Sequence, residues 1–311
     1  MAVIGAGLMG HALAQVFAEV GARVRIHDPV QEALASVPAR VSANLKKLDG
    51  DLGAVERISL CADLPSALEE AELVVEAAPE NLALKQELFE RLGRFASADT
   101  ILATNTSVIP VTRIAERAEG QDRIVGTHWW HPPYLVPLVE VVQAERTSQD
   151  TVTRTIELLR AAGKVPVHVK RDVPGFVGNR LQHALWREAI ALVSTEVCDP
   201  ETVDTVVKNS FGLRLPAIGP LEQAELIGLD LTLSIHEELL PHIDRTPGPS
   251  PYLRQLVDAG RLGMKTGEGF RRWTPEEADA VQARLATHLE AMTNPIREPI
   301  GAATSPGGAG E

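Results

Sequence analysis

Cysteine is scarce in this chain, because its 311 residues include only Cys61 and Cys198. Two cysteines so far apart have neither the spacing of a metal site nor the density of a disulfide framework, which fits a reducing intracellular setting. No apolar run approaches the roughly 20 residues of a membrane-spanning helix. The N-terminus also lacks the charged segment and cleavage signature of a secretion signal. We therefore expect a cytoplasmic protein without a metal site.

Basic residues are few beside the acidic ones. Lys and Arg number 30 against 42 Asp and Glu, which gives a formal net charge of −12. This balance argues against nucleic acid or an anionic membrane as the main partner. A hydrophobic content of 44% is that of a globular protein, and the length suggests two domains. We expect a small-molecule partner.

A glycine-rich turn follows the first apolar run. Met1–Ile4 has the pattern of a buried strand, and Gly5-Ala-Gly7-Leu8-Met9-Gly10 leads into an amphipathic helix that ends at Gly21. A second strand then ends at Asp28. Strand, glycine turn, helix, strand and acid form the dinucleotide-binding fingerprint, in which the helix N-terminus receives the pyrophosphate. Asp28 would bind a ribose 2′-hydroxyl and repel a 2′-phosphate, so NAD is favoured over NADP. A flavin site or an empty Rossmann fold is the alternative.

Strands and helices alternate as far as about residue 171, and the pattern is helical from Asp172 onward. We expect an α/β fold: a Rossmann-type doubly wound parallel sheet over 1–171, an all-helical domain over 172–298 and a disordered tail over 299–311. After the first two strands, further strands are expected at 72–77, 101–103, 124–127, 138–142 and 165–169. Residues 31–70 are expected to be helix and connector, and helical segments at 199–210, 221–240 and 250–260.

Two polar residues stand out in the stretch from Gly126 to Val142. His128 follows a short strand pattern, and Glu140 lies in the apolar run Leu138–Val142. A carboxylate among apolar neighbours is costly unless a partner binds it. The Pro132-Pro133 turn could fold the two strands side by side, and a His held by a carboxylate is a general base. The alternative is a buried structural pair.

Two more polar groups are candidates for the site. Asn105-Thr106-Ser107 comes directly after a buried strand, where ligands bind in open α/β sheets. Alternatively, this cluster caps a helix that begins near Pro110. Asn179, His183 and Arg187 are spaced four residues apart, so they share one helix face. That face either meets the substrate or is solvated, with Arg187 paired to Glu188 or Glu196.

These features together resemble the 3-hydroxyacyl-CoA dehydrogenase family, from Ala2 to about Trp273. The motifs that carry the resemblance are Gly5-Ala-Gly-Leu-Met-Gly10, Val74-Val-Glu-Ala-Ala-Pro-Glu80, Ala103-Thr-Asn-Thr-Ser107, Gly126-Thr-His128, Pro137-Leu-Val-Glu140 and Asp172-Val-Pro-Gly-Phe-Val-Gly-Asn-Arg180.

The resemblance implies a role for each matching residue. His128 corresponds to the catalytic base and Glu140 to the residue that orients it, while Ser107 and Asn179 correspond to the groups that bind the substrate. The cofactor-binding positions that it implies are Gly5, Gly7, Leu8, Met9, Gly10, Asp28, Ala77, Glu80, Lys85 and Asn105. It also implies NAD as cofactor and a homodimer formed through the helical domain.

Three departures from the family pattern bear on the substrate, and the second and third favour the branch that acts on small free acids, which includes carnitine dehydrogenases, lambda-crystallin-like gulonate dehydrogenases and a pyridine-carboxylate dehydrogenase. The usual His-Phe-Phe-Asn-Pro reads His128-Trp-Trp-His131-Pro132. The lysine-rich arm of acyl-CoA members is short here, with only Lys46 and Lys47, and the stretch from Pro133 to Glu140 is similar to the small-acid branch. His131, His183 and Arg187 are the expected substrate residues. A short acyl-CoA substrate, or a non-catalytic crystallin-like protein, is the alternative.

Overall fold

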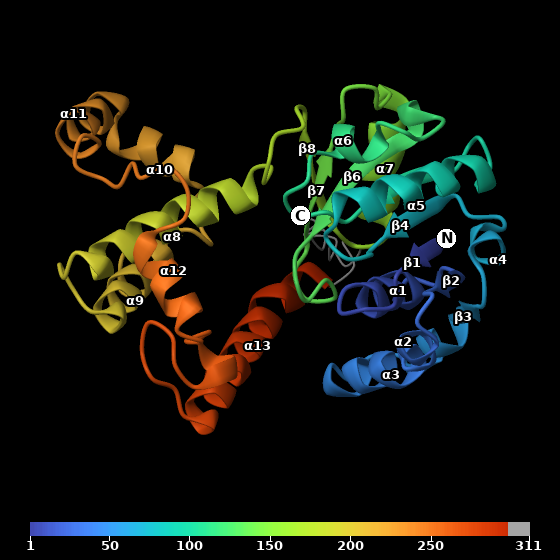
Figure 1. Ribbon diagram of the computed structural model, residues 1–311, viewed down its shortest axis with the longest axis horizontal. Coiled ribbons are helices and arrows are strands. Elements are labelled where there is room, and N and C mark those ends of the chain that lie inside the picture. The colour runs from blue at the N-terminus through green and yellow to red at the C-terminus, as the bar shows by residue number, and fades with distance from the viewer. Residues whose placement is uncertain (298–311) are drawn as a thin grey trace, which may run out of the picture. The chain divides into compact units, whose positions relative to one another are not determined.

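A single eight-stranded sheet organises the first part of the chain (Figure 1). The computed structural model describes residues 1–297, so the expected tail at 299–311 lies outside the described residues. The strand order is β3-β2-β1-β4-β5-β6-β7-β8, and every neighbouring pair is parallel except β6 with β7. The strands are β1 Ala2–Ile4, β2 Val24–His27, β3 Ile58–Cys61, β4 Leu73–Glu76, β5 Ile101–Thr104, β6 Ile124–Trp129, β7 Leu138–Val142 and β8 Val165–Val169.

Helices cover both faces of this sheet, and they leave β4 and β5 fully buried. Leu13 and Leu159 belong to the core of one face, and Phe89 and Ile114 to the core of the other. Apolar strands covered on both sides are what a parallel sheet requires, so the expected doubly wound fold is confirmed. The helices of this part are α1 Gly10–Glu19, α2 Gln31–Ala35, α3 Val37–Lys47, α4 Leu64–Leu68, α5 Leu82–Phe95, α6 Val111–Ala115 and α7 Gln149–Ala161, with 3-10 turns at Leu52–Arg57 and Gln121–Arg123.

Strand β3 corrects the expectation that residues 31–70 contain only helix and connector. It is a four-residue edge strand in which Ile58 is buried, whereas Ser59 and Leu60 are exposed. An edge strand this short has neither a continuous apolar run nor a clear alternation, so its pattern resembles a loop. Strand β6 likewise runs two residues further than expected, so His128 lies inside it.

The chain divides into two compact units. Among the described residues, the first unit is Met1–Asn179 together with residues 286–297, and the second is Arg180–Leu285. The division falls in the first turn of α8, a little beyond the expected boundary at residue 171. The remaining helices are α8 Gly178–Ser194, α9 Pro200–Asn209, α10 Pro220–Ile227, α11 Leu229–Leu239, α12 Pro251–Asp258 and α13 Pro275–Arg297, with 3-10 turns at Phe211–Leu213 and Met264–Thr266.

The helical segments of the second unit lie close to their expected positions, with one break. Gly228 has φ +100°, a conformation that glycine adopts readily, and it divides the expected segment 221–240 into α10 and α11. Within the described residues, no helix is long and apolar enough to cross a membrane.

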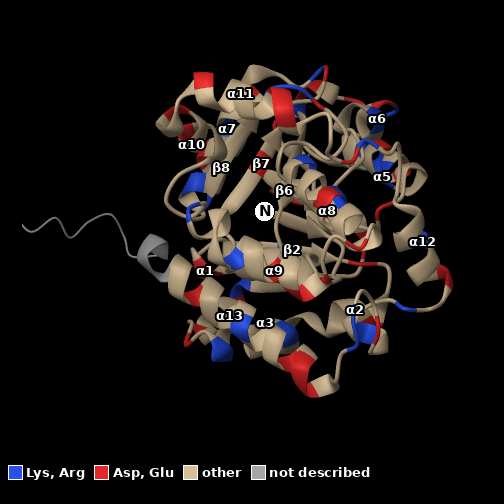
Figure 2. Ribbon diagram, turned by 90° about the vertical axis from the view of Figure 1, so that its left-hand side faces the viewer, with Lys and Arg blue, Asp and Glu red and all other residues tan. Residues whose placement is uncertain are grey.

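Helix α5 contains residues of both charges, and its ribbon is coloured by residue type in Figure 2. Glu90 pairs with Arg94 one turn further on, at 2.8 Å, and with Arg117 just after α6, also at 2.8 Å. These exposed pairs are weak contributors to stability. They link the outer face of α5 to the segment that follows α6.

Candidate active site

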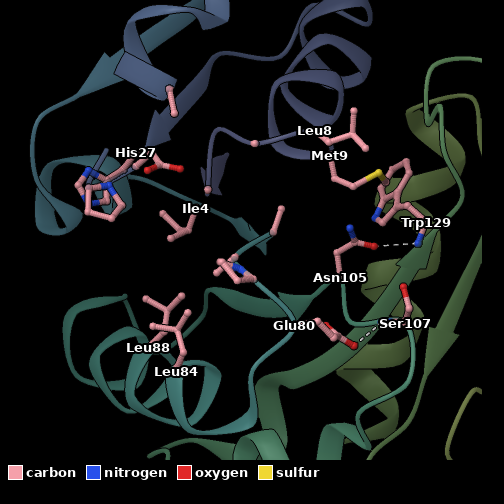
Figure 3. Close-up of a pocket in the computed structure, with 18 of the residues that line it drawn as sticks. Ile4, Leu8, Met9, His27, Glu80, Leu84, Leu88, Asn105, Ser107 and Trp129 are labelled. Atoms are coloured by element: carbon pink, nitrogen blue, oxygen red, sulfur yellow. Dashed lines mark hydrogen bonds between the residues drawn. The ribbon is translucent and has the colours of Figure 1, made fainter. Parts of the chain in front are cut away.

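A cavity of about 850 Å³ lies at the carboxyl ends of the central strands, within the first unit (Figure 3). In doubly wound folds this crevice is where ligands bind. Most of the residues expected for the site line it: Gly5, Gly7, Leu8, Met9, Asp28, Ala77, Glu80, Asn105, Ser107, His128, His131 and Asn179.

The glycine turn shapes one side of the cavity. Gly5 has φ +107°, and a Cβ there would lie 2.7 Å from the carbonyl oxygen of Ala77. A Cβ on Gly10 would lie 1.7 Å from the carbonyl oxygen of Gly5, whereas Gly7 faces open space. Helix α1 begins here without a side-chain cap and without an acidic residue in its first turn. Its first N–H groups are therefore suited to an anion, and the turn fits the pyrophosphate of NAD.

Asp28 is held beside this turn. Its Oδ2 accepts a hydrogen bond from the backbone N–H of Ala6 at 2.7 Å, and its Oδ1 accepts one from Val30 N–H at 2.8 Å. A carboxylate oxygen has two lone pairs, so each oxygen can still accept a bond from a ribose hydroxyl. Arg40 donates to the carbonyl oxygen of Ala6 at 2.9 Å. The arrangement suits a dinucleotide whose ribose is unphosphorylated.

His128 and Glu140 are directly opposite one another in the antiparallel pair of β6 and β7. Their Nδ1 and Oε2 atoms are 2.7 Å apart, and both side chains are buried. The other oxygen of Glu140, Oε1, accepts the backbone N–H groups of Val177 at 2.9 Å and Gly178 at 3.0 Å. Because a carboxylate binds Nδ1, Nε2 is the ring nitrogen that can accept a proton.

Electrostatics keep this carboxylate charged. Burial by itself would raise the pKa of Glu140, but the bonds from His128, Gly178 and Val177 outweigh it and lower the pKa. The rings of Trp130 and Phe176 pack against His128, with centroids 5.2 Å and 5.6 Å away. The imidazole is thus fixed on several sides, as a general base requires.

Ser107 and Asn179 meet at the same end of the cavity. The side-chain N–H of Asn179 donates to the carbonyl oxygen of Ser107 at 3.0 Å, while the backbone N–H of Ser107 donates to Glu80 Oε1 at 3.0 Å. Asn105 Oδ1 accepts the backbone N–H of Trp129 at 3.0 Å (Figure 3). Helix α6 starts after Pro110 without a side-chain cap, so the alternative that this cluster caps it is wrong.

Lys85 and Gly10 are placed differently from the cofactor contacts expected of them. Lys85 is fully buried, and its Nζ lies 2.6 Å from Glu76 Oε1. It does not line the cavity, and its Nζ also lies 3.7 Å from Glu80 Oε2. Gly10 has no room for a side chain because it packs on Gly5. Glu76 was not among the residues expected for the site, although a carboxylate in a buried strand is the same signal that pointed to Glu140.

His183 and Arg187 belong to the second unit, where they line a separate cavity of about 980 Å³. Arg187 Nε is 3.7 Å from Asp244 Oδ2, a partner that is neither Glu188 nor Glu196. Glu188 instead accepts the backbone N–H of Asp244 at 2.7 Å. In the described part of the chain, no group of three or more His, Cys, Asp or Glu side chains is placed to hold a metal ion.

Two family models match nearly all of the described chain. The 3-hydroxyacyl-CoA dehydrogenase NAD-binding domain matches residues 1–173, and the C-terminal domain of the same family matches residues 175–273.

The relatives are named for different substrates. The chain is 35% identical to 5-formyl-3-hydroxy-2-methylpyridine 4-carboxylate 5-dehydrogenase of Mesorhizobium japonicum, over 94% of this chain and 96% of that protein. A solved structure of the dehydrogenase of that substrate, described as an NAD⁺-dependent dismutase, superposes with a TM-score of 0.87 at 34% identity, and covers 96% of this chain and 98% of its own. A probable 3-hydroxybutyryl-CoA dehydrogenase of Bacillus subtilis is 40% identical over 86% of this chain and 95% of that protein.

Proposed function

The chain belongs to the 3-hydroxyacyl-CoA dehydrogenase family and is an NAD-dependent dehydrogenase, and we propose that its substrate is a small, free 3-hydroxy carboxylic acid. In this reaction a secondary alcohol and a ketone are interconverted, with His128 as the base. The observation that carries the mechanism is the 2.7 Å hydrogen bond from His128 to Glu140, in a cavity that begins at the dinucleotide turn.

Each residue of the proposed site has its own role in this reaction. His128 Nε2 takes the proton of the substrate hydroxyl, and Glu140 stabilises the imidazolium that results. Ser107 and Asn179 bind the substrate oxygen and hold the carbon in line for transfer. NAD, when bound, supplies the ring that accepts the hydride. In the reverse direction, protonated His128 returns the proton to the ketone oxygen.

Two observations support a free acid in preference to an acyl-CoA. The first is the shortage of available cations after β2, because CoA phosphates need such partners. Arg40 is bound to the carbonyl oxygen of Ala6, and Arg57 donates to the carbonyl oxygen of Ala18 at 3.0 Å. Lys46 and Lys47 close the short helix α3. The second is the likeness to the pyridine-carboxylate dehydrogenase, which extends over 94% of this chain.

A short acyl-CoA is the second candidate, and the 40% identity to the probable 3-hydroxybutyryl-CoA dehydrogenase favours it. One matched experiment separates the two. NADH formation would be followed by absorbance with free 3-hydroxy acids and with 3-hydroxybutyryl-CoA, at equal enzyme and NAD concentrations. We expect the highest kcat/KM with a free acid. Efficient turnover of the thioester, with no activity on any free acid tested, would move the protein to the CoA branch.

We also propose that the chain forms a homodimer through its second unit. That unit exposes many large apolar side chains, more than a solvated surface requires, and extended exposed apolar surface marks interaction sites. Examples on α10 and α11 are Leu221, Leu226, Leu229, Leu231 and Leu233.

A further inference from the structure

Glu80 is the centre of a charged network beneath one end of the cavity. Its Oε1 accepts three hydrogen bonds: from the hydroxyl of Thr106 at 2.6 Å and from the backbone N–H groups of Ser107 at 3.0 Å and Val108 at 3.2 Å. The loop that presents Ser107 is therefore tied to this one oxygen. Figure 3 shows the carboxylate of Glu80 directed towards the backbone of Ser107.

The other oxygen of Glu80 faces the buried ion pair. Oε2 lies 3.7 Å from Lys85 Nζ, which is itself 2.6 Å from Glu76 Oε1. Glu76 is bound further by the hydroxyl of Thr104 at 2.6 Å and the N–H of Ala78 at 2.6 Å. Lys85 and Glu76 neutralise one another, so Glu80 leaves the network with a net charge of −1.

This charge remains on Glu80 at neutral pH. Burial would raise the pKa of Glu80, but the Thr106 hydroxyl, the Lys85 ammonium and the N–H groups of Val108 and Ser107 outweigh burial and lower it. The side chain is 37% exposed and lines the cavity. A ligand that fills the cavity displaces the water that screens this carboxylate, so the charge then acts through a medium of lower dielectric constant.

The reacting end of the cofactor must lie close to this charge. Hydride leaves the same substrate carbon whose hydroxyl proton His128 takes, so the accepting ring has to lie beside His128 and Ser107. The glycine turn and Asp28 receive the pyrophosphate and the other ribose, further along the cavity. Glu80 contacts the Ser107 loop directly, and therefore borders the ring.

We propose that Glu80 is a determinant of the preference between oxidised and reduced cofactor. The nicotinamide ring is positively charged in NAD⁺ and neutral in NADH, so a net negative network beside it stabilises the oxidised form selectively. This inference rests on the proposed placement of the reaction at His128. Asp28, at the other end of the cavity, meets the same ribose in both forms and cannot distinguish them.

Binding of each cofactor to the substrate-free protein tests this directly. The dissociation constants of NAD⁺ and NADH would be measured calorimetrically for the wild type, Glu80→Gln and Glu80→Asp. Gln keeps an oxygen that can accept the three loop bonds but removes the charge. We expect the ratio of the NAD⁺ constant to the NADH constant to rise by roughly three- to tenfold in Glu80→Gln, the size of a screened unit-charge interaction at contact range. Glu80→Asp keeps the charge and should stay near the wild-type ratio.

Glu87→Gln is the matched control. Glu87 lines the same cavity from the exposed face of α5, so its loss changes the net charge equally without touching the network. Equal shifts of the NAD⁺/NADH ratio in Glu80→Gln and Glu87→Gln would show that only the net charge of the protein matters, which would overturn the proposal. An unchanged ratio in Glu80→Gln would also overturn it. A shifted ratio in Glu80→Asp would show that the geometry of the Ser107 loop, and not the charge of Glu80, sets the ratio. Because no substrate is present, these outcomes are independent of which hydroxy acid the enzyme oxidises.

Discussion

Glu140 is a buried carboxylate whose charge is stabilised by hydrogen bonds. Three donors bind it: the ring of His128 and the backbone N–H groups of Val177 and Gly178. Each bond to a charged group is worth more than a neutral one, so together they offset the cost of burying the charge. The same carboxylate thus orients the imidazole of His128 and holds the segment from which Asn179 projects.

The lowered pKa of Glu140 predicts an acid sensitivity of the fold. The pKa of Glu140 is lower in the folded protein than in the unfolded chain, where it is about 4.5. The contribution of this carboxylate to stability is therefore fully present above pH 4.5, and it is lost as the pH falls through the folded pKa. Thermal unfolding followed from pH 7 to pH 3 should therefore show a steeper loss of Tm in the wild type than in Glu140→Gln. Glu145→Gln, at an exposed carboxylate just beyond β7, should keep the wild-type slope; parallel curves for all three proteins would refute the assignment.

Asp28 should decide the choice of cofactor. Its carboxylate is fixed beside the glycine turn, where a 2′-phosphate would meet it. About 1.4 kcal/mol of repulsion makes a tenfold difference, so kcat/KM with NADP should be at least about tenfold lower than with NAD. Asp28→Asn should reduce the difference in kcat/KM between NAD and NADP. Equal efficiency of the wild type with both cofactors, measured side by side, would show that Asp28 does not exclude the phosphate.

At the scale of single residues, the sequence was informative where partners are close along the chain. His128 and Glu140 could be paired because a short turn separates two strands. Lys85 could not be placed, because its burial depends on Glu76 and Glu80 gathering around it once α5 packs on the sheet. Asp244, the partner of Arg187, is likewise distant in sequence.

We propose that cofactor binding depends on the turn between β1 and α1. Its glycines have different structural roles. A side chain at Gly10 would collide with the backbone of Gly5, whereas one at Gly7 would enter only the open cavity. Distinguishing these two roles requires the three-dimensional turn, since both positions belong to the same motif.

A matched pair of alanine variants tests the different roles of Gly7 and Gly10. Gly7→Ala should fold with a Tm within a few degrees of the wild type, and should weaken NAD binding because the methyl group occupies the path of the pyrophosphate. Gly10→Ala should lower the Tm strongly, because the new Cβ would lie 1.7 Å from a carbonyl oxygen. Circular dichroism melts and NADH fluorescence titrations measure both quantities. A stable Gly10→Ala protein that binds NADH normally would contradict the assigned close contact.

Elements with a strong period could be predicted, and those defined by the tertiary structure could not. The wholly buried strands β4 and β5 follow from their apolar patterns. The edge strand β3 exists because β2 offers it a partner, and that partner is not visible locally. Helix α8 begins at Gly178, although the helical pattern was expected from Asp172, because Phe176 adopts φ +50° and packs into the core of the sheet.

For the whole molecule, two units with different compositions follow from the change of pattern near Asp172. The sheet unit buries its apolar side chains in two cores, whereas the helical unit leaves many of them exposed. That contrast is not foreseeable from an amphipathic period, which shows that a helix has an apolar face but not what covers it.

A homodimer should be evident in solution. Light scattering coupled to size exclusion should give twice the 33.5 kDa mass of the chain, at micromolar concentrations. Leu229→Glu and Leu233→Glu, which place charges on exposed apolar positions of α11, should shift the mass towards that of one chain. A wild-type mass of 33.5 kDa at all concentrations would rule out the proposed association.

We propose above all that His128, held by Glu140, is the base of an NAD-dependent alcohol oxidation. The most direct test is the turnover of His128→Ala with the best substrate, together with an NADH titration of the same protein. The mechanism predicts that kcat falls by roughly 10²–10⁴-fold, as for removal of a general base, while the affinity for NADH stays near that of the wild type. A variant with near-wild-type turnover would contradict it.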